Sequence, residues 1–383
     1  MNRTAFFASS AALALFSATA CAQDTSYADA PFEVTEVAQF TQPWAMTFLP
    51  DGKMLVTEKG GTLRWATRDG EVSEPIAGVP DVDYGNQGGL GDVILHPDFE
   101  NNSRIYISYA EAGDDDTRGG AVAMATLTPS AEGGELTDLE VIWRQYPKTT
   151  GRGHYSYRMA FSPDGEYLFI SSGDRQKFTP AQDMEQNLGK IIRLRPDGSI
   201  PEDNPFVDQG GIAAQVWTLG MRNPLGIAFD ADGVLWEHEM GPRHGDEFQR
   251  IVRGENYGYP VVSNGDHYSG EEIPDHDTRP EFRAPETYWV PAISPAGLMF
   301  YSGDLFADWK GDAFIGGLSS QAMVRVSFDC EGEAEACEAA RYSIDDQRIR
   351  EVEQGPDGAI WVLQDQRRPE GEGGKLVKLT PAE

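Results

Sequence analysis

Basic residues, histidine and cysteine are all scarce in this chain. Its 383 residues hold 31 lysines and arginines against 62 aspartates and glutamates, so the formal net charge is −31 at pH 7. A charge of this sign and size argues against nucleic acids and anionic membrane surfaces as partners. Only six histidines and three cysteines are present. The sequence therefore predicts an acidic protein, and each of its few histidines and cysteines is a candidate for a specific structural or chemical role.

Long apolar runs are also missing, except close to the N-terminus. Arg3, the stretch AFFASSAALALF and the small residues SATACAQ are together typical of a secretion signal, which we place at residues 1–22. The apolar stretch is too short for a transmembrane helix. The tetrapeptide ATAC also resembles a lipoprotein processing box ending at Cys21, so soluble export and a lipid anchor remain alternatives. We predict an exported, periplasmic protein.

The cysteines fit this compartment. If Cys21 belongs to the processing region, Cys330 and Cys337 remain, separated by EGEAEA. A pair this close in an exported protein is most simply a disulfide that closes a local loop. A metal site would need further soft ligands nearby, and none occur in that segment.

The chain has no long run with helical periodicity. A strand–turn–strand unit recurs instead. WAMTFLPDGKMLVTE, YRMAFSPDGEYLFISSG and REVEQGPDGAIWVLQD are copies that predict hairpins, because Asp-Gly favours a tight turn between half-buried strands. The six turn aspartates, spaced 47–72 residues apart, are Asp51, Asp98, Asp164, Asp232, Asp304 and Asp357. Six copies predict a six-bladed β-propeller in one domain, residues 30–383, with long loops on its blades. An unrelated β-sandwich or β-helix is the alternative.

Polar residues stand at the ends of these hairpins, where propeller loops converge over the central channel. Gln87 lies in the glycine cluster DYGNQGGLGDV, His154 in GRGHYSYR, and Arg222 and Asn223 in LGMRNPLG. Each also has a structural interpretation: a plain turn for Gln87, a loop histidine bonded to backbone for His154, and a tied-down loop for Arg222–Asn223. Taken together and in order, they suggest a site.

Two further segments carry charge that needs a partner. In WEHEMGPRHGDE, carboxylates that include Asp246 surround a Gly241–Pro242 corner whose carbonyls could face a hard cation such as calcium. In QRIREVEQGPDG, Arg348 and Arg350 are two residues apart, so on a strand they point to one face. Two guanidinium groups on one face repel unless they share an anion, and this spacing favours an anionic ligand.

The ordered motifs resemble a known family. NQGGL, GHYSYRMAFSPDG, LGKIIRLRPDGSIPEDNPF, WTLGMRNPLGIAF, HEMGPRHGDE and RIREVEQGPDG are similar to segments of the soluble aldose sugar dehydrogenases that use pyrroloquinoline quinone, relatives of soluble quinoprotein glucose dehydrogenase. The resemblance covers nearly the whole chain after the leader. It implies a six-bladed propeller with the quinone over the channel, an aldose substrate oxidised to a lactone, and an electron acceptor outside the chain.

The resemblance also implies roles for individual residues. His154 matches the base that removes the anomeric hydroxyl proton, Arg222 an arginine beside the reactive quinone carbonyl, and Asp246 an acidic residue that orients the base. The implied cofactor contacts are Gln87, Arg222, Asn223, Arg348 and Arg350. Gly241 and Pro242 match the backbone carbonyls that ligate calcium.

Two departures from the family pattern stand out. Ser319 and Ser320 occupy the position where glucose-oxidising relatives have a lysine on the cofactor, and Met240 precedes Gly241 where relatives often carry glutamine or histidine. Two other functions remain as alternatives: a calcium-dependent, lactonase-type propeller hydrolase, and a non-catalytic propeller that binds glycans or another protein. The hydrolase would not need the pair Arg348 and Arg350, and the non-catalytic propeller gives no reason to keep His154, Arg222 and Asp246 together.

Overall fold

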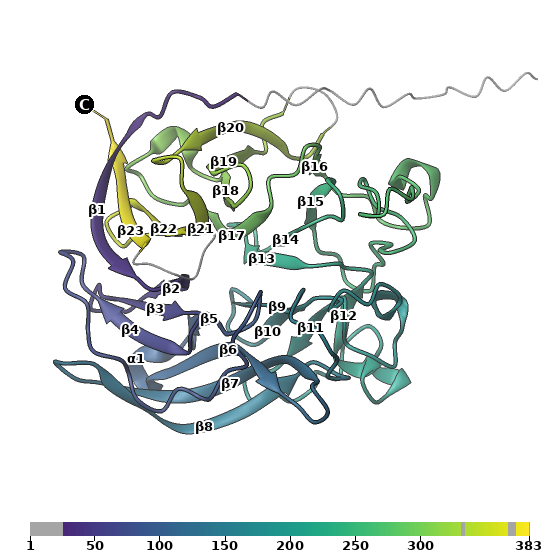
Figure 1. Cartoon of the computed structure of the whole chain (residues 1–383), viewed down its shortest axis with the longest axis horizontal. Helices are drawn as coiled ribbons and strands as arrows, with labels where there is room; N and C mark the ends of the chain where they lie inside the picture. The colour runs from purple at the N-terminus through teal and green to yellow at the C-terminus, as the bar shows by residue number, and fades with distance from the viewer. Residues whose placement is uncertain (1–25, 331–333, 367–372, 383) are drawn as a thin grey trace, which may run out of the picture.

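The computed structural model describes residues 26–330, 334–366 and 373–382. Six antiparallel sheets follow one another around a ring, which confirms the predicted six-bladed β-propeller (Figure 1). The predicted leader, residues 1–22, and Cys21 lie outside the described residues. We number the blades in chain order by their sheets.

The strands of blades 1 to 3 are β2 (Pro43–Phe48), β3 (Met54–Glu58), β4 (Thr62–Ala66), β5 (Leu90–Leu95), β6 (Arg104–Ala112), β7 (Arg118–Pro129), β8 (Gly134–Arg144), β9 (Ser156–Phe161), β10 (Leu168–Ser172), β11 (Lys190–Leu194) and β12 (Val216–Leu219). The strands of blades 4 to 6 are β13 (Pro224–Phe229), β14 (Leu235–Glu239), β15 (Asp246–Arg250), β16 (Thr287–Trp289), β17 (Pro295–Phe300), β18 (Ala313–Gly317), β19 (Ala322–Ser327), β20 (Cys337–Ser343), β21 (Arg348–Gln354), β22 (Ile360–Asp365), β23 (Gly374–Pro381) and β1 (Phe32–Phe40). Short helical turns lie between strands: α1 (Phe99–Asn102), η1 (Thr179–Gln182), η2 (Val207–Gln209), η3 (Ala213–Gln215), η4 (His276–Thr278) and η5 (Ala307–Trp309).

Each of the six sequence repeats forms the first two strands of one blade. These hairpins are β2–β3, β5–β6, β9–β10, β13–β14, β17–β18 and β21–β22. The first strands of neighbouring blades contact one another all the way round, from β2 through β5, β9, β13 and β17 to β21 and back. The repeats therefore form the inner wall of the ring. Two of the turns, at Asp98 and Asp304, are longer than the Asp-Gly prediction and include α1 and η5.

The ring closes through pairing of the two ends of the described chain. β1, from the N-terminal side, pairs antiparallel with β23, from Phe32 opposite Pro381 to Phe40 opposite Gly374 (Figure 1). Blade 6 is therefore built from β21, β22, β23 and β1. Because β2 and β21 also touch, blade 1 and blade 6 meet along this seam.

The apolar core consists of layers between blades. One buried cluster lies at each of the six blade interfaces; Leu55 and Leu63 of blade 1, for example, pack with Val93 and Ile105 of blade 2. The alternation of side chains along a strand explains this pattern, since successive residues face opposite sides of a sheet. Burial therefore specifies the register of the inner strands, whereas outer strands such as β1 and β8 are largely exposed.

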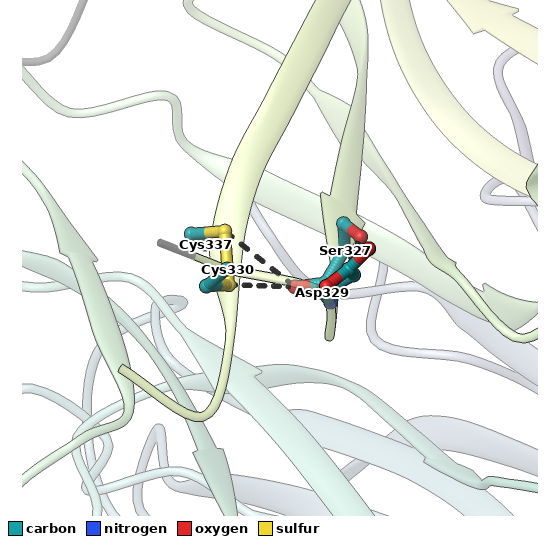
Figure 2. The surroundings of a disulfide bond; sticks show 4 residues. All are labelled: Ser327, Asp329, Cys330 and Cys337. Carbon is teal, nitrogen blue, oxygen red and sulfur yellow. Dashed lines mark hydrogen bonds between the residues drawn. A yellow bond between two sulfur atoms is a disulfide. The ribbon is translucent and has the colours of Figure 1, made fainter. Parts of the chain in front are cut away.

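The predicted disulfide is present. Cys330 and Cys337 are bonded across the connection between β19 and β20, with both sulfurs close to the Ser327 carbonyl (Figure 2). The bond closes a local hairpin of blade 5, as the spacing predicted. Among the residues described, none of the helices has the length and apolar character needed to cross a bilayer.

Replacing Leu379 with alanine should lower the free energy of unfolding by about 2–5 kcal/mol, the usual cost of such a cavity. Leu379 is fully buried on β23 against Phe32. Val34, its register partner on β1, is 39% exposed, so Val34→Ala should change stability by less than about 0.5 kcal/mol. Denaturant unfolding followed by circular dichroism measures both. Equal midpoints for the two variants would contradict this account of the seam.

Candidate active site

A pocket of about 540 Å³ lies at the centre of the ring and takes residues from all six blades. Trp44 comes from blade 1 and Gln87 from the approach to blade 2, while Tyr155 and Tyr157 flank the start of β9 in blade 3. Blades 4, 5 and 6 contribute chiefly Leu225, Met240, Ser294, Leu318, Arg348, Arg350 and Asp365. The volume is within the range of small-molecule sites. Of the residues predicted from the sequence, Gln87, Arg348 and Arg350 line this pocket. The others, which are His154, Arg222, Asn223, Gly241, Pro242 and Asp246, are not part of its lining, although Tyr155 and Met240 are direct chain neighbours of His154 and Gly241.

His154 lies directly before β9 and is held on two sides. Its backbone N–H donates to Gln87 Oε1 at 2.6 Å, and its ring Nδ1 lies 2.6 Å from Asp174 Oδ1. His154, Ser156 and Tyr157 all have positive φ, near +50° to +60°, which is strained for residues with a side chain. Nε2 makes no hydrogen bond to the described part of the chain. The histidine is thus fixed with one ring nitrogen left for a ligand.

Asp174, and not Asp246, orients His154, so the role inferred for Asp246 is corrected. The Asp246 carboxylate accepts hydrogen bonds from the backbone of Gly241 (2.9 Å) and of Ser294 (2.7 Å). It therefore stabilises the loops beside the pocket. Asp174 was missed although a signal existed: His154 and Asp174 flank the β9–β10 hairpin, in which Ser156 pairs with Ser172, and antiparallel strand ends lie side by side.

The electrostatics around His154 favour the neutral imidazole. Burial is the main cause that lowers its pKa, and the charge of Arg222 lowers it further, while Asp174 acts in the opposite direction. Burial alone would raise the pKa of Asp174, but the interactions with His154 and Arg222 hold it below its usual range. A neutral imidazole with an ionised carboxylate behind it is the arrangement of a general base.

Arg222 and Asn223 sit on a loop that Glu239 fixes. Glu239 Oε2 accepts the backbone N–H of both residues, and burial together with Glu247 raises the pKa of Glu239 to about 8. Arg222 Nη1 donates to Met240 O at 2.7 Å, and its own carbonyl accepts the Asp174 N–H. Asn223 Oδ1 accepts from Ser156, but Asn223 Nδ2 is buried without a partner among the described residues. That amide is an unsatisfied buried donor, and Asn223 is not among the residues that line the pocket.

Arg348 and Arg350 line the same pocket, as their spacing predicted. Their shared anion in the chain is Asp365, which sequence reasoning missed. Arg350 Nη2 is 2.5 Å from Asp365 Oδ2, and Arg348 Nη2 is 3.6 Å from the same oxygen. Asp365 ends β22, which is paired with β21, so only the register of that pair places it here.

The Gly241–Pro242 corner offers backbone oxygens. A Cβ on Gly241 would lie 2.2 Å from Gly245 O and 2.4 Å from His244 O, so only glycine fits this tight loop. The carbonyls of Gly241 and Pro242 accept no hydrogen bond from the described residues. Across those residues, no group of three or more acidic, histidine or cysteine side chains is placed to hold a metal. A cation at this corner would therefore depend on carbonyls and on oxygens of a bound ligand.

The geometry combines three chemical capabilities. His154 is a positioned base beside the pocket, Arg348 and Arg350 of blade 6 form a cationic wall, and Trp44, Tyr155 and Tyr157 belong to one buried aromatic cluster in the lining. Aromatic faces and cations together suit a flat anionic ligand. The base suits a substrate that gives up a proton.

Comparisons with known proteins show which family the chain is similar to. The family model described as Glucose / Sorbosone dehydrogenase matches residues 40–378. The chain is 40% identical to aldose sugar dehydrogenase YliI of Escherichia coli (strain K12) over 347 residues, which cover 88% of this chain and 90% of the relative. It is 30% identical to quinoprotein glucose dehydrogenase B of Acinetobacter calcoaceticus over 307 residues, 66% of this chain and 60% of that protein.

A solved structure is similar over almost the full length. The crystal structure of the soluble aldose sugar dehydrogenase from Escherichia coli, in the apo-form, superposes with a TM-score of 0.83 at 38% identity. The match covers 92% of this chain and 100% of that one. The propeller fold is therefore shared with this aldose sugar dehydrogenase.

Arg222→Met should raise the pKa of His154, because it removes a positive charge that opposes protonation of the imidazole. Asp174→Asn should lower it, because it removes the carboxylate that favours the imidazolium. Following the His154 ring protons by NMR through a pH titration measures both changes. Shifts of the same sign, or none, would show that these two side chains do not set the proton affinity of His154.

Proposed function

The chain belongs to the glucose/sorbosone dehydrogenase family, and from this we propose that it oxidises aldose sugars at the anomeric carbon, with hydride transfer to bound pyrroloquinoline quinone. The observation that carries the proposal is His154, held by Asp174 at 2.6 Å beside a pocket with a cationic wall. A hydrolase or a sugar-binding propeller has no need for that wall. The product of the oxidation is the sugar lactone.

The residues present fit the quinone, which is planar and carries carboxylates. Arg348 and Arg350 provide charge for the carboxylates, and Trp44, Tyr155 and Tyr157 provide apolar surface for the ring system. Asn223 Nδ2 is a buried donor that a ligand oxygen would satisfy. We assign Gln87, Arg222, Asn223, Arg348 and Arg350 to cofactor binding. When bound, pyrroloquinoline quinone supplies the acceptor for the hydride.

The proton path uses His154. Nε2 takes the proton of the anomeric hydroxyl while the C–H bond at that carbon breaks and its electron pair leaves as hydride. The carbon–oxygen double bond of the lactone forms at the same time. Asp174 stabilises the imidazolium through Nδ1–H. Burial, together with the nearby charge of Arg222, keeps His154 neutral before the reaction, and Arg222 would offer positive charge to an oxyanion bound next to it.

We assign calcium to the Gly241–Pro242 corner. Calcium prefers carboxylate and carbonyl oxygens, and the carbonyls of Gly241 and Pro242 accept no hydrogen bond from the described residues. Asp246 supports the corner by accepting the Gly241 N–H. Since side-chain ligands do not gather there, oxygens of the cofactor would complete the coordination. Calcium and quinone would then bind cooperatively.

We also propose that the protein is exported to the periplasm, on the leader predicted at residues 1–22. The Cys330–Cys337 disulfide supports an oxidising compartment. A lipid anchor at Cys21 is the alternative to release in soluble form. Peptide mass spectrometry of the mature N-terminus separates the two.

Replacing His154 with glutamine should slow aldose-driven reduction of the bound quinone by about two to four orders of magnitude, because glutamine cannot accept the proton. The quinone should still bind. In the native protein the rate should rise with pH below 6.5, because the pKa of His154 is lowered and only the neutral ring acts. Stopped-flow absorbance after reconstitution with quinone and calcium measures this. An active His154→Gln variant with an unchanged pH profile would exclude the assigned base; no reduction by any aldose would exclude the function.

Removing calcium should abolish turnover, and adding it back to protein that holds quinone should restore it. Calcium should also tighten quinone binding, because each ligand supplies oxygen or charge to the other. Calorimetric titrations with and without the metal measure this coupling. Full activity after exhaustive chelation, with no metal found by elemental analysis, would contradict the assignment.

A further inference from the structure

We propose that Lys59 is a third cationic contact for the carboxylates of the cofactor, supplied by blade 1 across the seam from Arg348 and Arg350. The inference rests on the proposed function. None of the sequence motifs included Lys59. Its positive charge lies in blade 1, whereas the cofactor lysine of glucose-oxidising relatives is inferred to lie at the position of Ser319 in blade 5.

Lys59 directly follows β3 and lines the central pocket together with Arg348, Arg350 and Asp365. Its Nζ donates to the Asn86 carbonyl at 2.6 Å, which holds the side chain against the rim. The Lys59 carbonyl accepts the Leu90 N–H, so its backbone is fixed as well. A Cβ on Gly89 would lie 2.1 Å from that carbonyl oxygen. The ammonium is therefore positioned by its surroundings before any ligand arrives.

The charges on this side of the pocket do not balance. Among the described lining residues, Lys59, Arg348 and Arg350 are positive and Asp365 is the one carboxylate. Asp365 is engaged by both arginines. Lys59 forms no ion pair with a carboxylate in the described chain, unlike Lys148, Lys310, Lys375 and Lys378. An excess of positive charge in a protein of net charge −31 is explained by an anionic ligand.

The lowered pKa of Lys59 also supports an anionic ligand beside it. Burial lowers its pKa to about 8, and the charges of Arg350 and Arg348 add to the effect while Asp365 opposes it. Burial thus disfavours the charged ammonium of Lys59, and holding it in this place costs free energy. A carboxylate bound between Lys59 and the arginines would remove that cost.

Blade 5 does not supply this charge. Ser319 is exposed and its hydroxyl donates to the Ala292 carbonyl. Leu318, its neighbour, lines the pocket with an apolar side chain. The cation that relatives are inferred to place at this position is therefore missing, and Lys59 stands on the other side of Arg348 and Arg350, in the blade that adjoins them at the seam.

The test is a calorimetric titration of the metal-loaded apoprotein with pyrroloquinoline quinone. Lys59→Gln should weaken binding by about 10- to 100-fold, the usual loss for a charge-assisted hydrogen bond. Lys59→Arg, which keeps the charge, should stay within a few-fold of the native protein. Lys148→Gln is the matched control, because Lys148 Nζ also donates to a backbone carbonyl, Ala112 O at 2.6 Å, but lies outside the pocket lining. It should leave the affinity unchanged.

A second measurement needs no variant. Acetylation of lysines by an N-hydroxysuccinimide ester, read by peptide mass spectrometry, should fall at Lys59 when the quinone is bound and stay constant at Lys148. Equal affinity of Lys59→Gln and the native protein, or equal acetylation of Lys59 with and without quinone, would overturn the role of Lys59 alone. Failure of the native protein to bind the quinone would overturn the proposed function as well.

Discussion

The pairing of β1 with β23 is the constraint on which the rest of the molecule depends. It brings a strand from the start of the described chain into the last sheet. Once the ring is closed, every blade has a neighbour on both sides, and all six apolar layers between blades are complete. Loops that are scattered along the sequence then point at one central pocket. The cluster of cations in the pocket is itself a product of closure, because Lys59 comes from the first blade and Arg348 and Arg350 come from the last.

The rigid inner wall allows the pocket to keep groups in conformations that an isolated loop would avoid. His154 and its neighbours Ser156 and Tyr157 have left-handed backbone angles, and the buried arginine Arg175 holds this loop by donating to the carbonyls of Gly151 and Gly153. Burial destabilises the protonated, charged form of the His154 imidazole. The Asp174 carboxylate offsets part of this destabilisation once the ring is protonated.

Local signals predicted the fold, and non-local pairing explains most of what they missed. Asp-Gly turns between alternating apolar strands mark each inner hairpin, so the six blades could be read from short segments. Asp365 and Lys59 line the pocket through strand register and the blade seam, which no short motif encodes. Asp174 reaches His154 across the ends of the β9–β10 hairpin, a local signal that the motifs did not mark. The role of orienting the base was assigned to Asp246 from the family resemblance, whereas its carboxylate accepts hydrogen bonds from the backbone N–H groups of Gly241 and Ser294.

The contrast between an acidic surface and a cationic pocket has a kinetic consequence. A polyanionic ligand approaching a protein of net charge −31 is repelled at distances up to the Debye length, about 10 Å at 0.1 M salt, and attracted only once it is inside the pocket. Added salt screens the exposed charges more than the buried ones. Higher ionic strength should thus speed the encounter of ligand and protein more than it shortens the lifetime of the complex.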